Sequence, residues 1–282
     1  MGTARILPES AGSPMRVILA FLLMLALISA SFASENTSVT DSSLHKLSPL
    51  KIGVYSVAVA SVVSYSVIKF YSVWDTTHIG FHFKKDDVNG DGLLMLDEIA
   101  HLFGGYTFVR AGAGLSRWAG LSEKTGILAG AGISFFVMTF MEYPLDAYKP
   151  NEGVSISDLA FDYAGTAIGV LRETVPALHN FDIKVGFEDI SRVPPEFLPR
   201  STPEHGVFVY WLTYSPAPKS FPLNIGLGYS VRHDEQRQPH PEWYLGVGTS
   251  LTELSKRFFG KYADDFEYLG IVEIALTAKI VE

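Results

Sequence analysis

The hydropathy pattern of the chain changes near Pro176, and this change constrains the fold more than any other feature. Before it, four apolar stretches, 52–68, 99–121, 125–141 and 157–172, have the length and composition of helices. After it, apolar and polar residues alternate in short segments, as they do in strands. The expected fold class is therefore α+β: an apolar, glycine-rich and membrane-associated bundle of about four helices, followed by a small antiparallel β region.

Two glycine pairs mark the third and fourth helices, Gly126 with Gly130 and Gly165 with Gly169. Small residues four positions apart let helix backbones approach closely, a device favoured in membranes. Glycine costs about 1 kcal/mol relative to alanine inside a helix. We therefore expect the glycines to be present because the helices make close contacts there.

The β region is expected to contain five strands. Each has an apolar face opposite a face of Gly, Ser, Thr and Asn, as in outer-membrane strands or in any one-sided antiparallel sheet. Five strands are too few for a lipid-facing barrel, so we expect a sheet that packs on the helices or on a membrane. The alternative is a set of strands that enter a partner's barrel. The expected segments are 181–188, 207–214, 221–232, 243–251 and 269–281.

The N-terminus has the order of a secretory signal. The basic start Met15-Arg16 is followed by the apolar run 17–28, and small residues before Ala33 predict cleavage after it. The alternative is an uncleaved anchor helix. The expected organisation is a signal peptide at 1–33, a flexible leader at 34–48, a helical domain at 49–176 and a β-rich region at 177–282.

The composition limits the cell compartments and the binding partners that we expect for this protein. Charged residues make up only 18% of the chain, against about a quarter in soluble domains, which points to contact with a membrane. The net charge of −8 without a basic run excludes unaided nucleic-acid binding. The absence of cysteine excludes disulfides, thiolate catalysis and a lipidated cysteine. We expect export to the periplasm or envelope of a Gram-negative-type bacterium, at a membrane, with the outer membrane favoured and an envelope protein as a possible partner.

The segment from Asp87 to Glu98 fits the calcium-loop pattern D-x-[DN]-x-[DN]-G-x5-E at every specified position. Calcium is therefore the first cofactor that the sequence predicts. What opposes it is Gly80, which interrupts any helix before the loop, so the alternative is a polar turn that enters the next helix. The expected ligands are the side chains of Asp87, Asn89, Asp91 and Glu98 and the carbonyl of Leu93, with Gly92 at the sharp turn.

Three pairs of acidic or histidine residues lie four positions apart in or beside the apolar helices, which places each pair on one helix face. Packed helices can bring such pairs together around a metal or a catalytic centre. The alternative is a buried hydrogen-bond network that holds the helices in register. The pairs are Asp97 with His101, Glu142 with Asp146, and Asp158 with Asp162.

Some of these residues also have a purely structural interpretation. Asp97 can cap the second helix, and Ser155 with Asp158 forms a capping-box pattern. Pro144 places a helix end between Glu142 and Asp146. Asp162 is the hardest to explain in this way, because an unpaired carboxylate in the middle of an apolar helix is costly.

The order of these motifs resembles the YfiM-like family of predicted periplasmic lipoproteins and is distantly similar to VanZ-like membrane proteins. The resemblance covers roughly 81–172 and implies an envelope location without an established activity. Typical members have lysine where Glu98 stands here, and this chain lacks their lipidation cysteine. The motifs that carry it are Asp97-xxx-His101, Glu142-xxx-Asp146, Ser157-Asp158-xxx-Asp162 and Gly165-xxx-Gly169. Beyond this range, Tyr210-Trp211-Leu212 and Gly228-Tyr229 resemble strands near the C-terminus of longer envelope relatives.

Three functions follow from the sequence. The first is a membrane-associated structural or assembly factor of the envelope, favoured because the chain has no nucleophile motif. The second is a membrane-embedded, metal-dependent hydrolase acting on a lipid-linked or phosphorylated envelope substrate, with the acidic and histidine pairs holding a second metal or acting in catalysis. The third is a calcium-stabilised binding module.

Overall fold

The structure, a computed structural model, describes residues 49–84, 92–150, 152–193, 205–218, 220–260, 263 and 267–281. Within them it contains five α-helices and one five-stranded antiparallel sheet, so the α+β class is confirmed. The predicted signal peptide and leader lie outside the described residues. The helices are α2 (Pro49–Thr77), α3 (Leu96–Ala119), α4 (Glu123–Phe140), α5 (Ile156–Thr174) and α7 (Leu251–Phe258); the strands are β1 (Phe181–Phe187), β2 (Phe208–Tyr214), β3 (Asn224–His233), β4 (Pro239–Thr249) and β5 (Ile274–Val281).

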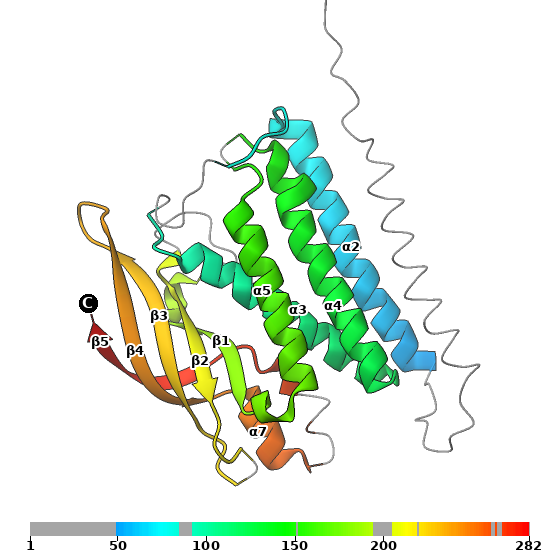
Figure 1. The fold of residues 1–282 in the computed structure, drawn as a ribbon, viewed down its shortest axis with the longest axis vertical. Helices are drawn as coiled ribbons and strands as arrows, with labels where there is room; N and C mark the ends of the chain where they lie inside the picture. Colours follow the sequence, from blue (N-terminus) through cyan, green and yellow to red (C-terminus); the bar gives the residue numbers. More distant parts are fainter. Residues whose placement is uncertain are drawn as a thin grey trace, which may run out of the picture. The chain divides into compact units, whose positions relative to one another are not determined.

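Helix α3 is the centre of the helical part. Figure 1 shows α2, α4 and α5 side by side, with α3 crossing behind α4 and α5 toward the sheet. The contacts are as close as the glycine pattern predicts, since a Cβ atom on Gly165 would overlap the carbonyl oxygen of Leu102, and one on Gly130 that of Val109. α3 therefore fixes the positions of both neighbouring helices at backbone distance.

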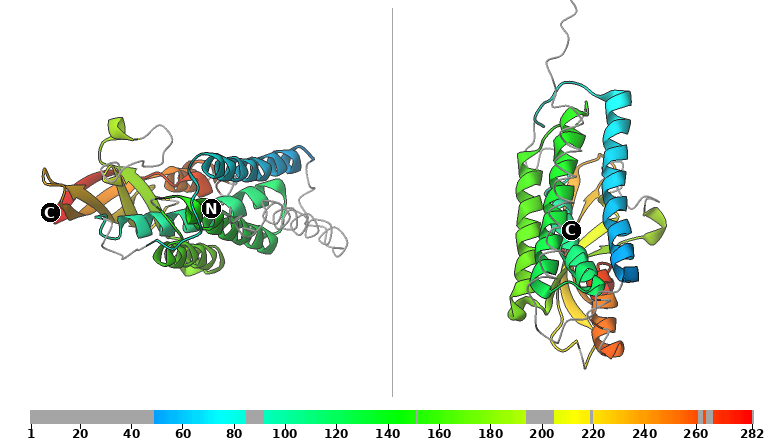
Figure 2. Two further views of the ribbon diagram at one scale, coloured as in Figure 1. Left: turned by 90° about the horizontal axis from the view of Figure 1, so that it is seen from above. Right: turned by 90° about the vertical axis from the view of Figure 1, so that its right-hand side faces the viewer.

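The sheet is a meander in the order β1-β2-β3-β4-β5, and Figure 2 shows it beside the helices. Successive residues of a strand point to opposite faces, so residues paired across the strands form rows on one face. Two neighbouring rows have opposite character. The first is the apolar row Ile183, Leu212, Leu227, Leu245 and Ala278, and the second is the row Lys184, Trp211, Gly228, Tyr244 and Lys279.

The face that carries the second row is covered. Trp211 is buried there and lies against glycines of three neighbouring strands, Gly186, Gly228 and Gly246, where any Cβ would meet the indole. The chain before β5 lies along the outer edge of β1, because the backbone N–H of Val185 donates to the carbonyl of Ile271 and the carbonyl of Val185 accepts the N–H of Glu273. It then continues into β5, which pairs with β4. One continuous segment thus lies along β1 at one edge of the sheet and then forms β5 at the other edge.

Several predicted boundaries differ from the structure. The last strand, expected over 269–281, begins at Ile274, because the residues before it lie along β1. The first helix was expected over 52–68 but spans Pro49–Thr77, because the helix continues past the end of its apolar run at Lys69. The strand expected from 221 begins at Asn224, since Pro222 has no N–H to pair. The strand expected over 243–251 ends at Thr249, where Ser250 and Glu253 form a capping box that begins the unpredicted helix α7.

Candidate functional site

The first side of the candidate site is the beginning of α3. Leu94 and Met95 have positive φ angles of 47° and 69°, so the chain turns sharply just before the helix. Leu93 and Leu96 pack in one buried cluster with Val231 of β3, which anchors this turn on the sheet. The helix therefore starts at a fixed point, and its first two turns carry Asp97 and His101 on one face.

The second side is the beginning of α5. Ser155 is the N-cap, as predicted, because its Oγ accepts the backbone N–H of Asp158 at 3.0 Å. The backbone N–H of Ser155 donates to Glu142 Oε2 at 2.9 Å. The N–H that a capping-box carboxylate would accept is therefore used by Glu142, and the carboxylate of Asp158 extends toward His101.

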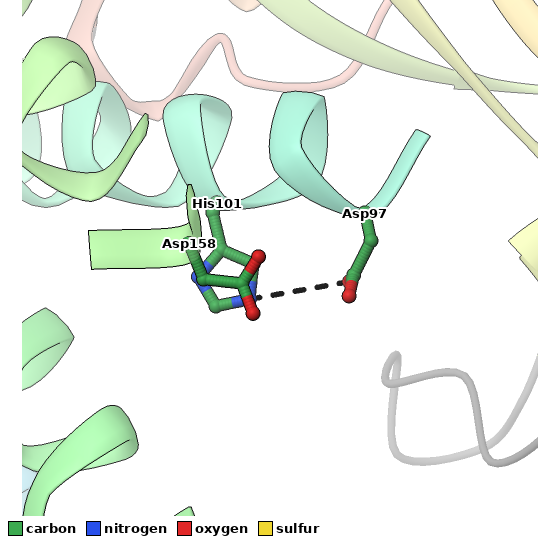
Figure 3. Close-up of side chains that lie close together, drawn as sticks. All are labelled: Asp97, His101 and Asp158. Atoms are coloured by element: carbon green, nitrogen blue, oxygen red, sulfur yellow. Dashed lines mark ion pairs between the residues drawn. The ribbon is translucent and has the colours of Figure 1, made fainter. Parts of the chain in front are cut away.

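His101 joins the two helices. Its Nδ1 lies 2.8 Å from Asp162 Oδ1, and its Nε2 lies 3.9 Å from both Asp97 Oδ1 and Asp158 Oδ2. Figure 3 shows Asp97 to one side of the imidazole and the Asp158 carboxylate overlapping the ring in this view. One ligand atom from each of Asp97, His101 and Asp158 lies within 4.8 Å of the other two, and the same holds for His101, Glu142 and Asp162. The structure thus brings together five of the six predicted carboxylate and histidine residues, with three aspartates around the His101 imidazole and Glu142 beside them.

The cluster carries more negative than positive charge. Lys84 Nζ lies 3.7 Å from Asp97 Oδ2 and 3.8 Å from Asp158 Oδ2. With His101 it supplies two cations against the carboxylates of Asp97, Asp158 and Asp162, which leaves a charge of −1 when these three are ionised. Burial raises the pKa of the fourth carboxyl group, that of Glu142, to about 8, so it is mostly protonated at neutral pH. Among the described residues, the buried atoms Asp158 Oδ1 and Asp162 Oδ2 have no hydrogen-bond partner.

Burial and these charges shift the titration of the cluster. Burial by itself lowers the pKa of His101, but the hydrogen bond and charge of Asp162, with the charges of Asp158 and Asp97, outweigh it and raise this pKa to about 10. Burial raises the pKa of both Asp158 and Asp162, although the charge of His101 opposes the rise. His101 is therefore charged at neutral pH and forms an ion pair with Asp162.

Two predicted site residues lie outside this cluster. Asp146 pairs with Lys149, and Tyr143 is extended at φ −139°, so Glu142 and Asp146 lie on either side of a helix end, as Pro144 predicts. Glu98 is buried in the first turn of α3 but belongs to neither ligand group.

The calcium prediction stays a prediction. Asp87, Asn89 and Asp91 lie outside the described residues. At the described end of the loop, Gly92 has a φ of 77°, which suits the turn that a glycine makes there. The carbonyl of Leu93, the fourth expected ligand, accepts the backbone N–H of Leu96 at 2.9 Å.

Sequence reasoning missed Lys84, which follows a short extended segment and carries no periodic signal. The structure brings it to the cluster because the backbone of Lys84 pairs with Val154, next to the N-cap of α5. It also missed the structural role of Glu142. The sequence feature that marks this residue is its position just before a helix-ending proline, and not its spacing to Asp146.

A second polar network lies farther along α3, around Arg110. Asp182 of β1 accepts hydrogen bonds from Arg110 and from Tyr106 Oη, the latter at 2.5 Å. Burial alone would raise the pKa of Asp182, but the charges of Arg110 and Arg172 outweigh it and hold this pKa below its usual value. The network also contains Glu173 and Glu267, and its contributors come from α3, α5, β1 and the turn before β5. Its further ion pairs are Arg110–Glu173, Arg110–Glu267, Arg117–Glu173, Arg172–Glu267 and Lys256–Glu267.

A third polar group fills the covered face of the sheet. Lys184 is fully buried and donates to Glu253 at 2.7 Å and to Glu273 at 3.1 Å. Ser215 donates to Glu253 and Asn224 to Glu273, at 2.7 and 3.0 Å. The lysine thus joins β1 to α7 and to the segment before β5.

An apolar cavity of about 420 Å³ lies between α3, α5 and the apolar face of the sheet. None of its lining residues belongs to the His101 cluster. The two charged residues that line it, Arg172 and Asp182, pair with each other at 3.6 Å. The cavity therefore offers mainly apolar surface. Its lining includes Leu102, Ile168, Phe181, Tyr210, Leu227 and Trp243.

Residues 90–174, less than a third of the chain, match the model of a family described as predicted periplasmic lipoprotein (DUF2279). The matched segment contains α3, α4 and α5, and with them every member of the His101 cluster except Lys84. No curated protein and no solved structure shows a significant match to this chain. The class that emerges is an α+β protein of unknown function whose helical core is similar to a periplasmic family, which supports export to the envelope.

Proposed function

We propose that this protein is a membrane-associated structural or assembly factor of the cell envelope, in which buried polar networks hold the helices and the sheet together inside an apolar exterior. The observation that carries the proposal is the reversed distribution of polarity. Acidic and basic residues are almost never fully buried in water-soluble proteins unless they are paired. Here the largest fully buried side chains include Arg110, Lys184, Glu98, Glu142, Glu242 and Glu253.

The sheet shows the reversal most clearly. One face holds the Lys184 group, whereas the other face is apolar, with α3 packed on it at Val185 and Val231 and much of the rest exposed. Leu276 is 87% exposed, and Ile274, Leu212, Ile225 and Leu245 are each more than half exposed. Water-soluble antiparallel sheets bury the apolar face instead. A contiguous apolar surface of this kind is typical of a site that contacts a membrane or a protein.

The helices support contact with lipid. Two segments, Pro49–Lys69 and Glu123–Tyr148, are long and apolar enough to cross a membrane. The first lies mostly uncovered, with Val57 and Ile68 about two-thirds exposed, so it is not a core helix of the described fold. On α4, Leu128 and Phe135 are likewise exposed. Exposed apolar residues therefore lie on the helices as well as on the sheet.

The same proposal includes the finer assignments. A YfiM-like protein with distant similarity to VanZ-like membrane proteins would lie at the envelope, and the outer membrane suits the strand pattern. The matched family is described as a lipoprotein, but this chain has no cysteine to carry a lipid. Its attachment to a membrane would then depend on the apolar helix and sheet surfaces.

The test uses the absence of native cysteine. A single cysteine is introduced by Leu276→Cys on the apolar sheet face, or by Glu235→Cys at the exposed β3–β4 turn, and labelled with an environment-sensitive fluorophore. The full chain is then reconstituted in liposomes whose acyl chains carry bromine, a contact quencher. We expect strong quenching at position 276 and little at position 235.

Equal quenching at the two positions, or a full chain that stays soluble without detergent, would contradict the proposal. If the label at 276 is shielded from water-soluble quenchers in cells and yet is not quenched by brominated lipid, a protein covers this face. In that case the strands dock on a partner instead of on lipid, and lipid contact of the sheet is wrong.

A further inference from the structure

The His101 cluster differs from the Arg110 network in its charge balance, which the scaffold role leaves unexplained. A network that only holds helices together has no need of surplus charge, because an uncompensated buried charge is costly. Here two cations face four carboxyl groups. Asp162 is fully buried and Asp158 is 4% exposed, and each has one buried oxygen without a hydrogen-bond partner among the described residues.

The geometry points to a divalent metal site, which we infer is formed by Asp97, His101 and Asp158, with Asp162 as the residue that positions the imidazole. Each residue offers one ligand atom, and the three atoms lie within 4.8 Å of one another. Nε2 of His101 lies 3.9 Å from an oxygen of each aspartate. Atoms at that separation can both bind an ion at about 2.1 Å, the usual length of a metal–nitrogen or metal–oxygen bond.

The orientation of the imidazole supports this assignment. A histidine that binds a metal through one ring nitrogen almost always donates its other N–H to a carboxylate or carbonyl, which fixes the tautomer. The Nδ1–Asp162 contact of 2.8 Å is such a bond, and it aims Nε2 at Asp97 and Asp158. Asp162 is in turn fixed in the middle of α5, next to the close contact of α3 with Gly165.

The donor set indicates the class of ion. Two carboxylates and one imidazole suit Mn²⁺, Fe²⁺ or Zn²⁺ better than Ca²⁺, which prefers oxygen ligands alone. An ion of charge +2 would replace the proton on Nε2 of His101, because a metal-bound imidazole is neutral. The ligands come from α3 and α5, so the ion would clamp the two helices at the end where the loop 87–98 begins α3. The inference goes beyond the scaffold role, which stands with or without an ion.

The first experiment loads the full chain, purified in mild detergent and stripped with a chelator, with Mn²⁺ alone. Elemental analysis after desalting should give one Mn²⁺ per chain, and electron spin echo spectroscopy should show the coupling of one imidazole nitrogen. Loss of that nitrogen coupling in His101→Gln, whose far-ultraviolet circular dichroism must match the wild type, assigns the ligand. Bound Mn²⁺ without any imidazole coupling in the wild type would overturn the inference.

Carboxylate variants then test the division of roles. We expect Asp97→Asn and Asp158→Asn to weaken Mn²⁺ binding more than 100-fold, and Asp162→Asn to weaken it by about 10- to 100-fold because its effect is indirect. Asp234→Asn is the matched control, since Asp234 and His240 form a similar pair, 3.2 Å apart, on the exposed β3–β4 turn.

Two outcomes would overturn the site. Binding that is unchanged in both Asp97→Asn and Asp158→Asn would place the ion elsewhere. One Ca²⁺ per chain that Asp87→Asn abolishes, with no Mn²⁺ retained by the wild type, would favour the loop 87–98 alone. Neither outcome affects the proposed membrane role, which the lipid quenching at position 276 tests separately.

Discussion

Helix α3 carries two buried polar clusters that differ in their charge balance. Around Arg110, the three arginines Arg110, Arg117 and Arg172 face the three carboxylates Glu173, Asp182 and Glu267, with Lys256 as an additional cation. Around His101, two cations face four carboxyl groups. In the first cluster the cations equal or outnumber the carboxylates, whereas in the second the carboxyl groups outnumber the cations. The two clusters are both buried and therefore differ in charge balance rather than in burial.

The largest expected effect is in the balanced cluster. Arg110→Met would leave Asp182 with Arg172 as its remaining arginine at 3.6 Å and remove three ion pairs at once. Breaking a buried pair in this way costs about 3–5 kcal/mol. Unfolding in detergent by guanidinium, followed by circular dichroism, measures the loss. Arg192→Met, at an exposed arginine, is the control. Equal effects of the two substitutions would show that the network contributes nothing to stability.

The acidic and histidine residues of the His101 cluster could be predicted from the sequence, whereas the Arg110 network could not. Asp97, His101, Asp158 and Asp162 could be found because spacing along a helix places them on one face. The Arg110 network could not, because its acidic members lie on a strand, at the end of α5 and in the turn before β5, and no periodicity links these elements. The sequence feature that belongs to this network is that Arg110 and Arg117 interrupt an otherwise apolar helix, and this does not identify their partners.

The fold, too, could be predicted from the sequence only in part. Period and glycine spacing predicted the helices, the strands and the close contacts of α3. They could not show which face of the sheet is covered, because an alternating strand has the same pattern whether its apolar face meets a core or a membrane. Helix α7 was within reach, since Ser250 and Glu253 have the capping-box spacing.

A smaller effect is expected at the contact that supports both clusters. Gly165→Ala would force a Cβ into the carbonyl of Leu102, beside His101, and overpacking of this kind costs about 1–3 kcal/mol. Gly132→Ala on α4 meets no atom within 4 Å, so it should be neutral or stabilising by up to about 1 kcal/mol. Thermal unfolding of the two variants in detergent makes the comparison. If Gly165→Ala is as stable as Gly132→Ala, the two helices are not held at backbone distance.

Low pH should destabilise the balanced cluster around Arg110. The folded-state pKa values of Asp182 and Glu267 are held low, because neighbouring cations outweigh the effect of burial. Their stabilisation is therefore fully present above the unfolded-state values of about 4 and is lost as the pH falls through the lower folded-state values. We expect the free energy of unfolding to fall by about 1–2 kcal/mol between pH 5 and pH 3. Urea unfolding at each pH measures this loss. Arg110→Met should flatten this dependence, and an unchanged slope in that variant would contradict the account.

The smallest effect, and one of opposite sign, is expected in the surplus-charge cluster without metal. Asp158→Asn removes one of four carboxyl groups while keeping the shape of the side chain and the N-cap bond to the backbone of residue 158. Its ionic contacts to His101 and Lys84 are long, at 3.9 and 3.8 Å, and burial raises its pKa, so the folded state gains little from this charge. The stability of the chelator-treated protein should stay the same or rise by about 1 kcal/mol. Asp182→Asn, the same change in the balanced cluster, should destabilise the protein. If both substitutions destabilise equally, the charge of Asp158 is already compensated within the fold, and the distinction between the two clusters is wrong.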